Sequence, residues 1–190
     1  ISKLSTHVQQ SGSGPDLILL HHSTGHSGWT PFYERLAQSF SVTVPDLPGY
    51  GESDRPDWAR EPRDISVLMN QLINKLGLES PTVVGLGFGG FIAAELAATN
   101  GANLGNLVLV GAAGVRPQEG QIVDQMLIDH TDYMKQGFSD EATFNEQYIE
   151  TSDDGEEDID PVARDLWEFS RIMTARLTWS PYMFSRVLPE

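Results

Sequence analysis

The chain of 190 residues contains no cysteine. Disulfide bonds, thiol catalysis and cysteine-ligated metal sites are therefore excluded. Long apolar runs are also missing, since none approaches the roughly 20 residues that a helix needs to cross a bilayer. The first residues lack the charged and then apolar pattern of a secretory signal, although Ile1 is not an initiator methionine. We therefore expect a cytoplasmic protein with no membrane span.

Basic residues are scarce. The chain has 12 lysines and arginines against 27 aspartates and glutamates, a net charge of -15. This balance argues against nucleic acid as a partner, because such binding relies on basic side chains that neutralise phosphates. Residues 117–190 hold 17 of the 27 acidic residues. The shift in charge predicts two parts, 1–116 and 117–190, with a boundary near Arg116.

The hydrophobic pattern of the first part alternates between segments typical of strands and segments typical of helices. Short apolar runs predict strands at 17–20, 42–44, 82–85 and 107–110, and helices are expected at 31–39, 64–76 and 88–99. Such alternation predicts an α/β domain with a mainly parallel sheet and helices on both faces. Little room remains before residue 17, so we expect an early strand of such a sheet to be missing.

The second part shows no comparable strand. Helices are expected at 119–136 and 139–150, and a third begins where Asp160 can cap and Pro161 can take the first helical position. An acidic run at 153–160 separates the last two helices. Its spacing does not match the EF-hand pattern, so a solvated loop is favoured over a calcium site.

Residues 85–90, with the sequence GLGFGG, lie between a predicted strand and a predicted helix. They fit the nucleophile elbow G-x-S-x-G, with Gly87 in place of the serine. They also fit the dinucleotide fingerprint G-x-G-x-x-G, which requires an acidic residue about 20 positions later to hold the ribose. Residues 96–118 contain neither Asp nor Glu. The pattern therefore favours the elbow.

Two further segments support this interpretation. Residues 21–29 read HHSTGHSGW, and residues 45–53 read PDLPGYGES. With the elbow, they closely resemble three landmarks of the α/β-hydrolase superfamily: its His-Gly oxyanion loop, its D-x-P-G-x-G-x-S loop and its nucleophile elbow. The resemblance covers nearly the whole chain and places residues 117–190 where the family has a helical cap domain. It implies no cofactor.

The resemblance also implies roles for particular residues. The backbone N–H groups of Ser23 and Phe88 would form the oxyanion hole. Gly87 has no side chain with which to attack a carbonyl. His22 stands where the family usually has glycine, and Asp46 matches a position that usually shapes its loop.

The histidines of residues 21–26 raise other possibilities. Three histidines invite a zinc site, but adjacent residues at a strand end point in opposite directions, so His21 and His22 are not expected to share a metal. Ser23 or Ser27 could act as a displaced nucleophile only with a nearby base and an orienting acid, which the sequence does not identify.

The second part is rich in aromatic residues and methionine. These side chains either pack within that part or cover the elbow and form a pocket for a hydrophobic small molecule. The pocket candidates are His22, His26, Trp167 and Met173. The sequence makes no prediction of oligomeric state.

Three functions remain open. The first is a hydrolase of esters or related carbonyl compounds whose serine is absent from this sequence. The second is a pseudoenzyme that binds a small molecule or a protein partner. The N-myc downstream regulated proteins, which have a hydrolase fold without the nucleophile, resemble this case. The third is a lyase or cofactor-free oxygenase that does not use the elbow side chain. The family's acid and histidine normally follow the cap, so we expect a truncated chain with weak or no serine-hydrolase activity.

Overall fold

The computed structural model describes residues 4–26, 28–114, 119, 127–148, 150–151 and 157–158. Its centre is a five-stranded sheet with the strand order β1-β3-β2-β4-β5. The strands are β1 (Val8–Ser11), β2 (Asp16–Leu20), β3 (Ser41–Pro45), β4 (Thr82–Leu86) and β5 (Leu107–Val110). β1 is antiparallel to β3, and all other neighbours are parallel. The predicted mainly parallel sheet is confirmed.

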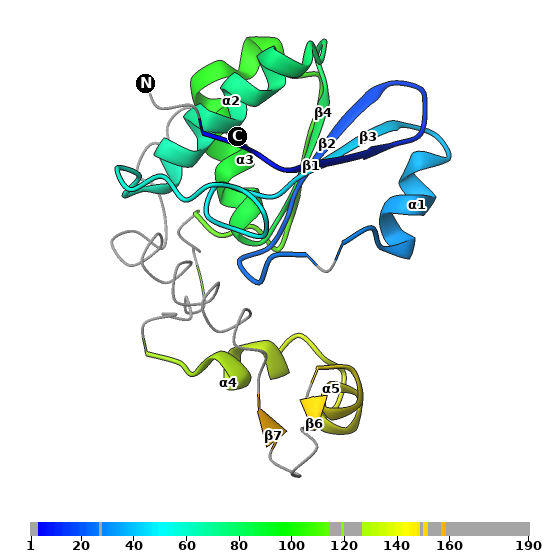
Figure 1. Ribbon diagram of the computed structural model, residues 1–190, viewed down its shortest axis with the longest axis vertical. Coiled ribbons are helices and arrows are strands. Elements are labelled where there is room, and N and C mark those ends of the chain that lie inside the picture. Colours follow the sequence, from blue (N-terminus) through cyan, green and yellow to red (C-terminus); the bar gives the residue numbers. More distant parts are fainter. Residues whose placement is uncertain are drawn as a thin grey trace.

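Helices cover both faces of this sheet (Figure 1). α1 (Pro31–Ala37) packs on one face, and α2 (Pro62–Leu76) and α3 (Phe88–Asn100) pack on the other. The side chains of β2 alternate between the two layers: Ile18 and Leu20 join the core under α2 and α3, whereas Leu17 and Leu19 join the core under α1. This double burial explains the unbroken apolar run of β2.

The first strand was not expected from the sequence. β1 lies before residue 17 and pairs with β3 over four residues, from Val8↔Pro45 to Ser11↔Val42. The residues before 17 thus hold one strand of the sheet, and the expectation that an early strand is missing stays a prediction. β1 lies at the edge of the sheet and is partly exposed, so its sequence VQQS carries no apolar run that would identify a strand.

α2 and α3 form the layer behind the site. α2 begins with a reciprocal capping box between Glu61 and Asp64 and ends at Gly77, whose φ of 68° is left-handed. Arg63 Nε on α2 lies 3.0 Å from Glu95 Oε2 on α3, and the Glu95 side chain is only 4% exposed. This ion pair fixes the first turn of α2 against the middle of α3.

The second part contributes α4 (His130–Lys135), α5 (Glu141–Tyr148), β6 (Glu150–Thr151) and β7 (Glu157–Asp158). The helix predicted at 119–136 is confirmed over 130–135, while 127–129 are not helical because Asp129 caps α4 with its side chain. The antiparallel pair β6–β7 was not predicted. The third helix, expected from residue 160, and the boundary near residue 116 lie outside the described residues.

α4 and α5 lie beyond the carboxyl ends of the parallel strands (Figure 1). This is the edge at which open α/β sheets bind their ligands. None of the helices in the described segments is both long enough and apolar enough to cross a membrane.

Candidate active site at the elbow between β4 and α3

The turn between β4 and α3 has the geometry that its glycines predict. Gly87 has φ 51° and ψ -110° and is the N-cap of α3. Its N–H donates to the Val110 carbonyl at 2.9 Å, and its own carbonyl accepts from Ala113 N–H at 3.1 Å. A side chain at this φ would be strained. The apex of the elbow is therefore anchored to the end of β5 on both sides.

Close packing explains a neighbouring glycine. A β-carbon built on Gly89 would overlap the carbonyl oxygens of Leu20 and His21 at the end of β2. Without a side chain at Gly89, the first turn of α3 can lie directly against this strand end. The turn thus brings the elbow next to the loop that follows β2.

The imidazole of His22 fills the space above Gly87. A β-carbon on Gly87 would overlap this ring, and its nearest atoms would be Cδ2 and Nε2 of His22. The space that a side chain at position 87 would need is thus occupied by a side chain from another loop. The sequence identified both residues as departures from the family pattern, but it gave no sign that they touch.

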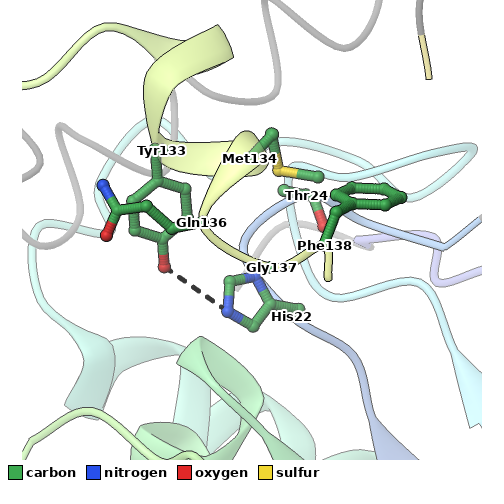
Figure 2. Close-up of a pocket in the computed structure, with 7 residues that line it drawn as sticks. All are labelled: His22, Thr24, Tyr133, Met134, Gln136, Gly137 and Phe138. Carbon is green, nitrogen blue, oxygen red and sulfur yellow. Dashed lines mark hydrogen bonds between the residues drawn. The ribbon is translucent and has the colours of Figure 1, made fainter. Parts of the chain in front are cut away.

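Polar groups flank both ring nitrogens of His22. Ser23 Oγ lies 3.0 Å from Nδ1, and Tyr133 Oη of α4 lies 3.5 Å from Nε2 (Figure 2). The His22 and Tyr133 rings are tilted by 33° with their centroids 6.1 Å apart. Burial lowers the pKa of the His22 imidazole below its ordinary value of 6.5, which favours the neutral ring.

A cavity of about 450 Å³ opens beside this ring. Figure 2 shows its wall, which combines the loop after β2 with α4 and the turn after it. The lining residues are His22, Thr24, Tyr133, Met134, Gln136, Gly137 and Phe138. None of them is an aspartate, glutamate, lysine or arginine. The cavity therefore suits an uncharged ligand.

His21 is buried and structural. Its Nδ1 lies 2.7 Å from the His22 carbonyl, and its Nε2 accepts a hydrogen bond from Leu47 N–H at 2.9 Å. Burial lowers the pKa of His21 to about 4. Because Nε2 must accept, Nδ1 carries the proton. The ring is thereby fixed as a neutral brace between two loops.

His26 belongs to a different cluster, built around Asp46. The His26 Nε2 lies 2.6 Å from Asp46 Oδ1, and His7 Nδ1 lies 3.0 Å from Oδ2. Oδ2 also accepts the N–H of Glu52 at 2.9 Å. Burial would raise the pKa of Asp46, but the hydrogen bond from Glu52 and the interactions with His26 and His7 outweigh it and lower that pKa. The expected loop-shaping duty of Asp46 agrees with these contacts.

The three histidines of residues 21–26 therefore have different surroundings. His22 lines the cavity, whereas His21 and His26 brace the loops around it. Within the described part of the chain, no three His, Cys, Asp or Glu side chains are grouped so that they could hold a metal ion.

The predicted oxyanion-hole residues lie next to the elbow. Phe88 is the first residue of α3, so its N–H has no partner within the helix. Ser23 is fully buried and contacts His22 through its hydroxyl. Their pairing as donors to one oxygen stays a prediction.

Other candidates lie elsewhere. Trp167 and Met173 fall outside the described residues. Sequence reasoning missed Tyr133, Met134 and Phe138 individually, although it expected the second part to line a pocket. The sequence feature that pointed to these residues was the concentration of aromatic residues and methionine in the second part of the chain.

With this geometry in place, the comparisons with known proteins identify the family. Residues 16–153 match the model of the alpha/beta hydrolase fold, and the chain belongs to this family. It is 36% identical over 117 residues to 2-hydroxymuconate semialdehyde hydrolase of Pseudomonas sp. (strain CF600), which covers 59% of this chain and 41% of that protein. It is 34% identical over 128 residues to the pimeloyl-[acyl-carrier protein] methyl ester esterase of Pseudoalteromonas atlantica. This match covers 62% of this chain and 48% of that protein.

Solved structures agree on the fold. A mutant of N-acyl homoserine lactonase matches with a TM-score of 0.66 and 23% identity, covering 90% of this chain and 65% of the other. An alpha/beta hydrolase fold protein from Burkholderia ambifaria matches with a TM-score of 0.63 and 22% identity. This match covers 95% of this chain and 70% of the other. The matched part of the chain spans 31% to 48% of the length of three curated relatives.

Proposed function

We propose that this protein is a hydrolase by ancestry that binds a small, uncharged carbonyl compound at the elbow and forms no acyl-enzyme at position 87. One observation carries the proposal: the His22 imidazole occupies the space that a side chain on Gly87 would need. A covalent intermediate requires a nucleophile at the reacting carbon, and glycine offers none.

The surroundings of the elbow support carbonyl binding. The N–H of Phe88 starts α3 and is aimed out of the helix end, where a partly negative oxygen is favoured. The cavity of about 450 Å³ has the size of a small-molecule site. Its walls are uncharged and the whole chain carries a net charge of -15, so anionic ligands are disfavoured.

Two of the similar proteins fit this ligand class. The methyl ester esterase is named for an ester substrate. The lactonase structure is of a serine-to-glycine mutant in complex with N-hexanoyl homoserine lactone. A hydrolase-fold protein with such a replacement can thus hold a lactone.

The binding half of the proposal is tested by titrating the protein calorimetrically with N-hexanoyl homoserine lactone. We expect one saturable site that is lost in Met134→Glu, because a carboxylate then stands in an uncharged wall. Val67→Glu adds the same charge at an exposed position on α2 and should bind like the unmodified protein. Equal binding by both variants, or no binding by the unmodified protein, would contradict the proposal.

The covalent half is tested with a fluorophosphonate probe, which reacts with activated serines. We expect no labelled peptide from residues 82–100 of the unmodified protein. A labelled serine anywhere in the chain, removed by competing ester, would show a nucleophile that this account lacks.

A further inference from the structure

His22 is the described histidine that lines the cavity. Both ring nitrogens of His21 are engaged with the backbone, and His7 and His26 are held by Asp46. His22 has Ser23 Oγ at Nδ1, while Nε2 lies on the cavity side beneath Tyr133 (Figure 2). An imidazole that is oriented through Nδ1, and whose Nε2 makes a long 3.5 Å contact with the Tyr133 hydroxyl on the cavity side, has the arrangement of a general base.

The His22 ring also lies directly against the elbow. The Nε2 atom is one of the two ring atoms nearest to the β-carbon position of Gly87. The N–H of Phe88 belongs to the next residue along the chain. For a carbonyl whose oxygen accepts from Phe88 N–H, the His22 ring is therefore the side chain placed beside the elbow that can activate a water on the cavity side.

We propose that His22 is a general base that activates water for direct hydrolysis of an uncharged ester or lactone held in this cavity. The inference rests on the proposed function, since it needs the carbonyl compound at the elbow. It extends that function from binding to a slow turnover that does not pass through a covalent intermediate.

In this hydrolysis His22 carries one proton from water to the leaving oxygen. With its proton on Nδ1 and directed at Ser23 Oγ, neutral His22 takes a proton from water at Nε2 while the water oxygen bonds to the carbonyl carbon. The resulting oxyanion accepts from Phe88 N–H. When the bond to the leaving oxygen breaks, the imidazolium returns the proton to that oxygen. The products are a carboxylic acid and an alcohol, and His22 is neutral again.

The electrostatics predict a slow reaction. Among the described residues no carboxylate lines the cavity, so none of them stabilises the imidazolium as an acid does in a catalytic triad. The low pKa of His22 keeps the ring neutral and able to accept a proton, but it also makes the ring a weak base.

The experiment measures hydrolysis of p-nitrophenyl butyrate by the unmodified protein and three variants, with circular dichroism to confirm folding. His22→Asn keeps an amide near the Nδ1 position and removes Nε2. We expect it to lose about 100-fold of the rate above background, the scale of one general base. His7→Asn removes a histidine of the Asp46 cluster and controls for catalysis by any imidazole, so its rate should be unchanged.

Gly87→Ala keeps His22 but places a methyl group where the ring lies, so it should also lose most of the rate. Turnover that survives in His22→Asn, or that falls equally in His7→Asn, would overturn the role of His22. A burst of one equivalent of p-nitrophenol would overturn direct hydrolysis. If the protein binds the lactone in calorimetry yet hydrolyses no ester, this inference fails while the proposed function stands; if it binds nothing, both fail.

Discussion

His22 and Gly87 share one space above the elbow: the imidazole lies where the β-carbon of any other residue at position 87 would be. The resemblance to the family predicts glycine in the oxyanion loop and serine at the apex, so both positions are expected departures from its pattern. The structure makes these two residues interdependent, because a side chain at position 87 would have to displace the ring.

The first prediction concerns pH. The pKa of His21 is lowered from 6.5 to about 4 by burial, so the unfolded chain binds more protons than the folded one between these values. The contribution of neutral His21 to the free energy of unfolding should therefore be complete above pH 6.5 and be lost as the pH drops toward 4. The shift corresponds to about 3 kcal/mol. Urea denaturation at a series of pH values measures this slope.

The control for this slope is His21→Gln, which cannot take up the proton. The pH dependence between 4 and 6.5 should become shallower in this variant, although burial of His22 lowers its pKa as well and leaves part of the slope. An identical slope in the variant and the unmodified protein would show that His21 is not held neutral by the fold.

The second prediction concerns the Asp46 cluster. Asp46→Asn should lower the free energy of unfolding by about 2–3 kcal/mol, because charged hydrogen bonds to His26, His7 and Glu52 N–H are weakened together. Asp57→Asn, an exposed carboxylate in the following loop, is the matched control and should be nearly neutral. Chemical denaturation of both variants at pH 7 measures these losses of stability. Equal losses in the two variants would contradict the predicted role of Asp46.

The same carboxylate predicts acid sensitivity at a lower pH. The folded-state pKa of Asp46 is depressed, so its contribution is present above the ordinary value of 3.8 and is lost as the pH falls through the folded value. In Asp46→Asn the loss of stability below pH 4 should be smaller. Acid titration followed by circular dichroism measures this, and an unchanged acid transition would contradict it.

The third prediction concerns the ion pair between α2 and α3. Arg63→Met should cost about 1–3 kcal/mol, since it leaves the buried Glu95 carboxylate without its guanidinium. The double variant Arg63→Met with Glu95→Leu should recover most of this loss because no buried charge remains. Thermal unfolding of the three variants tests the pair. A double variant that loses as much as the sum of its single changes would contradict the account.

Much of the fold could be predicted because its determinants are local. The apolar run of β2, the stripe of α2 and the glycines between β4 and α3 each depend on neighbouring residues. β1 was missed because an edge strand with two exposed residues needs no apolar run. The pair β6–β7 was missed because two residues per strand leave no periodicity to read.

The site was predicted in part for the same reason. Gly87, Ser23, Phe88 and His22 belong to motifs whose order along the chain is informative. The contact between His22 and Gly87 joins residues 65 positions apart, and Tyr133 approaches His22 from a helix still further away. Such contacts depend on how loops and helices pack at the carboxyl edge of the sheet, which spacing alone does not encode.

The most direct test of the account is a double-mutant cycle between positions 22 and 87, measured as the free energy of unfolding in urea. Gly87→Ser alone should cost about 1–3 kcal/mol, from the left-handed φ and from displacing the imidazole. With His22→Ala in place, the displacement is gone and the same change should cost about 1 kcal/mol less. Strictly additive losses would mean that the ring does not fill the space of the missing side chain, and the account would be wrong.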